Sequence, residues 1–281
     1  MAPRTPPTVR MRRLASELRR LRGAAGMSRE DVAGRTDINV ATLYRLETAK
    51  GRPQRRTLTS LLELYQVAPE ERDALFALLK AAGEKGWVQP YAGSIPEEYS
   101  MYIQLESEAA SVRNYESLLV PGLLQTAGYI VASSAGQMPL MPVDQIDLQA
   151  KIRVGRQDLL TRSNPLALWA IVDEAVLHRV VGGPDVMRDQ FEHLLSMMEL
   201  PNVTFQVVPF SAGSHVGMLG SFSLLDFPDP DPTVACVETM AGSMFRETED
   251  EVRACTVAFD HLRATAASPA ASARMVSDRL R

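Results

Sequence analysis

Two short helices separated by a few residues, within residues 28–47, are the feature that most constrains the fold of this chain. Ser28 is a favourable N-cap and is followed three residues later by Asp31, a weaker capping-box partner than glutamate. Asn39 is a second N-cap, and the helix that it begins is predicted to end at Glu47. Apolar residues at helical spacing mark the inward faces of the two helices, Val32 and Ala33 on the first and Leu43 and Leu46 on the second, and Ile38 is the apolar anchor of the turn between them. The first helix therefore braces the second, whose opening turns face outward.

The same helical spacing continues on both sides of this pair. Leucines between residues 14 and 21 predict a helix before it, and two more helices are predicted at residues 55–66 and 69–82. We therefore expect an all-α helix-turn-helix bundle of about five helices in residues 10–82.

The pattern changes after Pro165. Short apolar runs bounded by glycine, proline and polar residues predict about four strands, at residues 166–172, 203–210, 220–227 and 233–239. Helices are predicted around them at residues 97–115, 143–162, 184–199 and 247–266. The second half is therefore expected to be an α+β domain. The chain as a whole is expected to divide into a disordered arm (1–9), the helical domain (10–82), a linker (83–96), the α+β domain (97–266) and a C-terminal tail (267–281).

Charge is distributed unevenly along the chain. Residues 1–60 contain fourteen Arg or Lys and five Asp or Glu, whereas residues 61–281 contain sixteen and twenty-nine. Thirteen of the fourteen basic residues are arginines, whose planar guanidinium groups suit bidentate contacts with phosphate and guanine. A basic N-terminal fifth followed by an acidic remainder is the pattern expected of a DNA-binding domain attached to a second domain.

A short helix braced in this way can place its first turns in the major groove of double-stranded DNA. The residues expected to contact bases face outward near its start: Val40, Ala41, Thr42 and Arg45. Phosphate contacts are expected from residues around it: Ser28, Arg29, Tyr44, Arg52, Arg55 and Arg56. Glu47 is expected to bond within the bundle instead. Because one such helix reads few base pairs, we expect a homodimer on a palindromic operator.

Two stretches resemble known families. The segment around the two short helices, LRRLRGAAGMSREDVAGRTDINVATLYRLETAKGRP, is similar to the Xre/Cro-type helix-turn-helix, which also has Glu at position 47 but often has Gln at the position of Arg29. The segments ESEAASVRNYESLLVPGLLQTAGY and PNVTFQVVPFSAGSH resemble the C-terminal domain of WhiJ-like, antitoxin-like actinomycete regulators. The resemblance implies a transcription regulator whose second domain responds to a small protein partner. Repression is the simplest outcome, with activation as an alternative.

A small-molecule effector is the alternative input to a partner protein. The candidate residues for either input are Arg156, Gln157, Asp173, Glu174 and His215. Two of them also have structural interpretations, because Arg156 could pair with Glu174 across the core and His215 could bond to backbone in its loop. An enzyme fused to a DNA-binding domain is a third possibility, with the adjacent carboxylates of Asp173 and Glu174 as its acid–base pair.

Other classes of function find no support in the sequence. The chain has no G-x-S-x-G, phosphate-binding GxxxxGK or H-E-x-x-H motif and no clustered Cys and His, so we predict no catalytic residue, metal or cofactor. The longest apolar run, Leu166–Val172, has seven residues and is too short to cross a membrane. Cys236 and Cys255 are expected to be reduced thiols in the cytoplasm.

Overall fold

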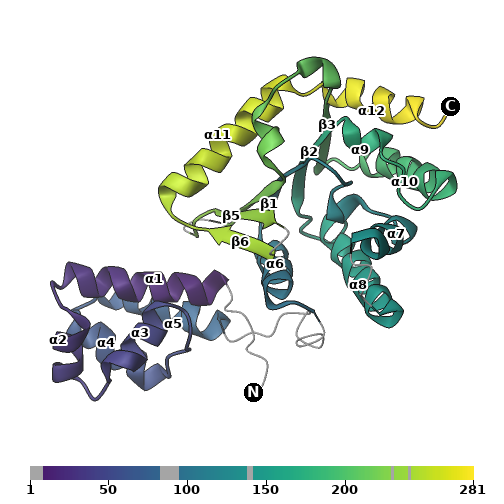
Figure 1. Ribbon diagram of the computed structural model, residues 1–281. Helices are drawn as coiled ribbons and strands as arrows, with labels where there is room; N and C mark the ends of the chain where they lie inside the picture. The colour runs from purple at the N-terminus through teal and green to yellow at the C-terminus, as the bar shows by residue number, and fades with distance from the viewer. Residues whose placement is uncertain (1–8, 83–94, 138–141, 229–230, 240–241) are drawn as a thin grey trace. The chain divides into compact units, whose positions relative to one another are not determined.

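The computed structural model describes residues 9–82, 95–137, 142–228, 231–239 and 242–281, and the chain divides into two compact units between Gly93 and Ser94 (Figure 1). Of the expected N-terminal arm, residues 1–8 lie outside the described residues, and Val9 begins the first helix. The expected linker also lies outside them, except for Ile95 and Pro96.

The first unit is the predicted helical bundle. Its helices are α1 (Val9–Ala24), α2 (Arg29–Arg35), α3 (Val40–Glu47), α4 (Arg55–Leu64) and α5 (Pro69–Ala81). Leucines from several of them meet in one core, and Leu14, Leu43 and Leu58 are at most 1% exposed. Burial of such side chains stabilises a fold by about 1.5–3 kcal/mol each. The prediction of about five helices is confirmed.

Local hydrogen bonds determine where α2 and α3 begin. The Ser28 hydroxyl accepts from the Asp31 amide at 3.0 Å, and the Asp31 carboxylate accepts from the Ser28 amide at 2.8 Å, which completes the predicted capping box. The Asn39 side-chain oxygen accepts from the Thr42 amide at 2.8 Å. Gly26, with φ of +66°, supplies the left-handed residue that ends α1 and turns the chain into α2.

The second unit is built on a six-stranded mixed sheet with the order β3-β2-β1-β4-β5-β6. The strands are β1 (Ser111–Glu116), β2 (Ala167–Asp173), β3 (Val203–Val208), β4 (Phe222–Asp226), β5 (Val234–Thr239) and β6 (Gly242–Arg246). Strands β1, β2 and β3 are parallel, whereas β4, β5 and β6 add antiparallel pairs. The α+β class is confirmed, with six strands where the sequence predicts about four.

The two additional strands are β1 and β6. The helix predicted at residues 97–115 ends at Glu108 as α6 (Glu97–Glu108), and the chain then enters β1. Strand β1 lies at the centre of the sheet between β2 and β4, so pairing with distant strands overrides its local pattern. Strand β6 forms a hairpin with β5 at the sheet edge.

Helices cover both faces of this sheet (Figure 1). Helix α11 (Glu249–Thr265) lies on one face, and α7 (Ala127–Gln137), α8 (Val143–Arg156) and α10 (Pro184–Met197) lie on the other. The short helix α9 (Ala175–His178) follows β2. None of the helices within the described ranges has both the length and the apolar character that crossing a bilayer requires.

The C-terminal segment is part of the folded unit, although the sequence suggests a tail at residues 267–281. Helix α12 (Pro269–Asp278) packs against β3 and α10. The Ser272 hydroxyl accepts a hydrogen bond from the Val207 amide at 3.0 Å, and the Val276 side chain is fully buried. This helix therefore covers the β3 edge of the sheet.

Candidate nucleic-acid interface and the cavity of the second unit

Helix α3 has one buried and one exposed face. Leu43 and Leu46 are 1% and 4% exposed and pack into the bundle. Three of the four predicted base-reading residues, Val40, Ala41 and Arg45, are exposed, and Thr42 is half-buried. The opening turns of α3 are thus accessible, as a helix that enters the major groove requires.

Glu47 at the end of α3 holds the bundle together. Its carboxylate is buried and accepts from Arg22 Nε at 2.6 Å and from Arg29 Nε at 2.8 Å. Arg22 also donates to the Met27 carbonyl at 2.7 Å. Burial alone would raise the pKa of Glu47, but the hydrogen bonds from the two arginines outweigh it and hold that pKa below its usual value. The prediction that Glu47 bonds within the bundle is confirmed.

The residues predicted to contact phosphate differ in whether their side chains already interact with other groups of the protein. Arg29 binds Glu47 and stacks 5.3 Å from the centre of the Tyr44 ring, and Arg55 stacks 4.6 Å from that of Phe76. Arg52 donates to the Leu79 carbonyl at the end of α5, at 2.8 Å.

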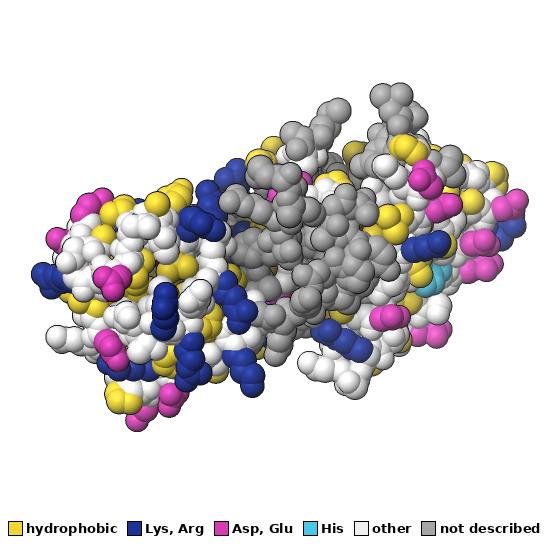
Figure 2. Space-filling view, turned by 90° about the horizontal axis from the view of Figure 1, so that it is seen from below, with side chains coloured by type: hydrophobic (Ala, Val, Ile, Leu, Met, Phe, Trp, Pro, Cys, Tyr) yellow, Lys and Arg dark blue, Asp and Glu magenta, His cyan; other side chains and the backbone are white. Residues whose placement is uncertain are grey.

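Ser28 is the least suited to hold a phosphate, because both its amide and its hydroxyl donate to the Asp31 carboxylate. Arg45 and Arg56, in contrast, are exposed and form no ion pair with the part of the chain that the structure describes. Lys and Arg side chains gather on the visible face of this unit, at the left of Figure 2.

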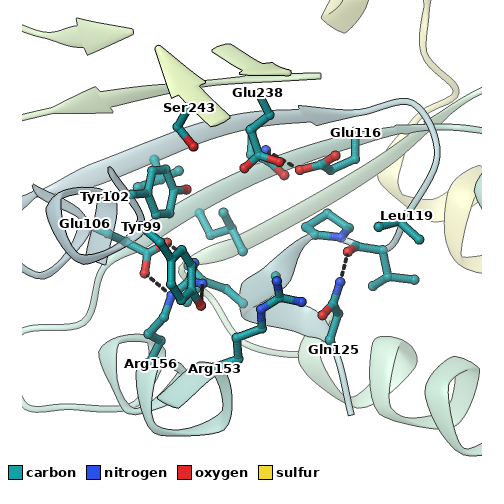
Figure 3. A pocket seen from close by; sticks show the side chains of 17 residues that line it. Tyr99, Tyr102, Glu106, Glu116, Leu119, Gln125, Arg153, Arg156, Glu238 and Ser243 are labelled. Carbon is teal, nitrogen blue, oxygen red and sulfur yellow. Dashed lines mark hydrogen bonds and ion pairs between the residues drawn. The ribbon is translucent and has the colours of Figure 1, made fainter. Parts of the chain in front are cut away.

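A cavity of about 110 Å³ lies in the second unit, where α6, α8 and the loop after β1 meet the sheet (Figure 3). At one side of it, Arg156 Nε and Nη2 each donate to the Glu106 carboxylate at 2.7 Å, and Nη1 donates to the Tyr99 hydroxyl at 3.0 Å. Arg156 and Glu106 are 4% and 0% exposed. The predicted pairing of Arg156 with Glu174 is therefore wrong, because Glu106 occupies the guanidinium group.

Three of the other candidate residues, Asp173, Glu174 and His215, make their hydrogen bonds at the carboxyl end of β2. His215 Nε2 lies 3.2 Å from the Asp173 carboxylate, so the expected bond from His215 to backbone is wrong. Glu174 accepts from the Phe210 amide at 2.7 Å. Gln157 donates to the Gln125 carbonyl and braces the loop beside the cavity. The five candidates therefore do not form one site.

The sequence patterns did not single out most of the residues that line the cavity. Glu106 lies within a predicted helix, and no local signal distinguishes it from an exposed charged residue. Asn114 and Glu116 both lie in β1, and Glu116 is its last residue. Asn114 falls within the helix predicted at residues 97–115, and Glu116 directly follows it. Only their pairing with distant segments brings these side chains together.

Comparison with known families agrees with this two-part architecture. The model of a helix-turn-helix domain matches residues 13–75, and that of a domain of unknown function (DUF5753) matches residues 99–278. Searches among curated proteins and among solved structures gave no significant match. The second family match covers more than half of the chain. The chain therefore belongs to the DUF5753 family and carries a helix-turn-helix DNA-binding domain at its N-terminal end.

Proposed function

We propose that this chain is a sequence-specific transcription regulator that reads double-stranded DNA with α3. The observation that carries the proposal is the geometry of α3. Leu43, Leu46 and Glu47 are buried against the rest of the bundle, whereas the first turns of the helix are accessible. In this proposal Arg45 contacts guanine, and the exposed side chains of Val40 and Ala41 contact thymine methyl groups.

The regulatory part of the proposal concerns the second unit. A homodimer would bring two α3 helices onto a palindromic operator in the cytoplasm, and occupancy of the operator would repress transcription by blocking the promoter. The second unit would mediate dimerisation and respond to a small protein partner. A small-molecule effector is a second candidate input, and the cavity beside Arg156 favours it. We assign no catalytic role to the chain.

Replacement of Arg45 by alanine tests base reading. We expect affinity for an operator selected from a random DNA library to fall by about 1–3 kcal/mol, while affinity for unrelated DNA changes little. Fluorescence anisotropy at fixed ionic strength measures both. Equal losses on the two DNAs would remove Arg45 from the base-reading set.

Arg56→Ala is the matched test of a phosphate contact, because this exposed side chain carries no ion pair with the described residues. We expect affinity to fall alike on operator and unrelated DNA, and the slope of log affinity against log salt to decrease by about one unit. The measurement is an anisotropy titration repeated at several salt concentrations. An unchanged slope would show that Arg56 does not contact the DNA backbone.

A further inference from the structure

The cavity of the second unit is lined by buried acceptor atoms that lack a donor among the described residues. Within those residues, the side-chain oxygens of Asn114 and Gln125 accept no hydrogen bond, although the two side chains are only 6% and 3% exposed. The Asn114 amide nitrogen donates to Ser223 and to the Glu116 carboxylate, and that of Gln125 donates to the Val120 carbonyl. A buried acceptor without a partner is costly, so both oxygens are suited to a ligand that donates hydrogen bonds.

Two carboxylates accompany these oxygens. The side chains of Glu116 on β1 and Glu238 on β5 point toward one another at one side of the cavity (Figure 3). Neither forms an ion pair within the ranges that the structure describes. Burial, followed by the charge of Glu238, raises the pKa of Glu116 to about 8. A positive charge between the two carboxylates would relieve this repulsion.

The cations that are already present do not balance the cavity. Arg156 is fully engaged by Glu106 and Tyr99. Arg153 stacks 5.7 Å from the centre of the Tyr99 ring. Its charge lowers the pKa of Glu116, but burial and the charge of Glu238 raise that pKa by more. When all of them are ionised, three carboxylates of the lining (Glu106, Glu116 and Glu238) face two guanidinium groups (Arg153 and Arg156), and this excess of negative charge disfavours an anionic ligand.

The size and the remaining walls of the cavity restrict the ligand further. Val112, Leu123 and Leu168 supply apolar surface. A cavity of roughly 150 Å³ holds benzene, with its six carbon atoms. The 110 Å³ found here therefore fits a group of about four or five non-hydrogen atoms. A short alkyl chain that ends in a charged donor group meets both conditions.

We propose that this cavity binds a primary alkylammonium group, with Glu116 and Glu238 as counter-charges and the Asn114 and Gln125 oxygens as acceptors. An ammonium group has three N–H donors and no acceptor, which suits a lining of carboxylate and amide oxygens. The group can belong to a free amine or to the lysine side chain of a protein partner. Binding does not depend on the proposed regulator function; only its role as the regulatory input rests on that function.

The test titrates the full chain, without DNA and at about pH 9, with n-butylammonium, butyrate and 1-butanol, which have similar size and different charge. At this pH the Glu116 carboxyl, whose pKa is about 8, is ionised, and a primary ammonium group keeps its proton. Binding is followed by saturation-transfer NMR. We expect n-butylammonium to bind at least about tenfold more tightly than the other two, which corresponds to about 1.4 kcal/mol. Equal or tighter binding of butyrate or butanol, or no saturable binding of n-butylammonium below about 50 mM, would overturn the proposal.

Two variants locate the site. Glu116→Gln and Glu238→Gln should each weaken n-butylammonium binding by about tenfold, because each removes one counter-charge. Glu199→Gln, which changes an exposed carboxylate outside the cavity, should leave the affinity unchanged. Because Glu238 is exposed, its replacement is expected to leave the fold intact. The Glu238→Gln protein therefore shows whether the amine binds in this cavity even if Glu116→Gln does not fold. Unchanged affinity in a folded Glu238→Gln protein would place the bound amine elsewhere and refute the assignment.

A last comparison identifies the source of the ammonium group. A lysine-containing peptide that binds more tightly than n-butylammonium, and more tightly than its norleucine counterpart, indicates a partner side chain. Weaker binding of that peptide indicates a free amine. Both results retain the cation site. Operator binding is measured separately by anisotropy, so a chain that binds the amine and no DNA would refute only the regulator function.

Discussion

Replacement of Glu106 by alanine is expected to destabilise the second unit by about 3–5 kcal/mol. The Arg156 guanidinium, which is 4% exposed, would lose both of its 2.7 Å hydrogen bonds and its counter-charge. The Tyr99 hydroxyl would remain as its only hydrogen-bond partner within the described structure. A buried charge without compensation is costly because the interior solvates it poorly. Equilibrium unfolding in urea, followed by circular dichroism, measures the loss.

Two comparisons show whether the uncompensated charge is the cause. The double replacement Glu106→Met and Arg156→Met removes both charges together and should recover most of the lost stability. Asp185→Ala removes an exposed partner of Arg188 and should leave the unfolding midpoint nearly unchanged. A Glu106→Ala protein as stable as the Asp185→Ala protein would contradict the prediction.

Glu47→Ala should destabilise the first unit by about 2–4 kcal/mol, because Arg22 and Arg29 lose the carboxylate that joins them. The expected loss is smaller than for Glu106, since the side chains of these arginines are 16% and 30% exposed and can recover water. Loss of this contact also releases α2 from α3, so operator affinity should fall with stability. Urea unfolding and DNA anisotropy measure the two effects.

Glu17 is the matched control for this prediction. It pairs with the exposed Arg20 on the surface of α1, and such pairs contribute little to stability. Glu17→Ala should therefore shift the urea midpoint far less than Glu47→Ala does. Similar shifts for the two variants would mean that the Glu47 cluster does not join the helices.

The helices of the first unit could be predicted within a few residues, because their ends are encoded by local chemistry. Ser28 and Asn39 supply side-chain caps, and Pro69 occupies the first turn of α5. The outward face of α3 followed in the same way from the helical spacing of Leu43 and Leu46. These signals operate over one or two turns, which is the range that a sequence pattern reports.

The second unit was harder to predict, because its central contacts join distant residues. Strand β1 has no glycine or proline before it, and its inner positions include Arg113 and Asn114, so nothing local separates it from α6. Glu106 and Arg156 are 50 residues apart in the chain. Helical spacing shows that such charged residues lie on a helix, but not which of them turns inward to form an ion pair.

The position of β1 in the sheet affects how the chain folds during translation. Ser111 on β1 bonds to Asp226 on β4, 115 residues later, whereas the Arg22–Glu47 contact of the first unit spans only 25 residues. Local contacts form quickly, so the DNA-binding unit can fold soon after it leaves the ribosome. At translation rates of about 5–20 residues per second, β1 waits roughly ten seconds for the strand that completes its pairing. During that interval the edge of β1 that pairs with β4 lacks its partner and is open to misassociation.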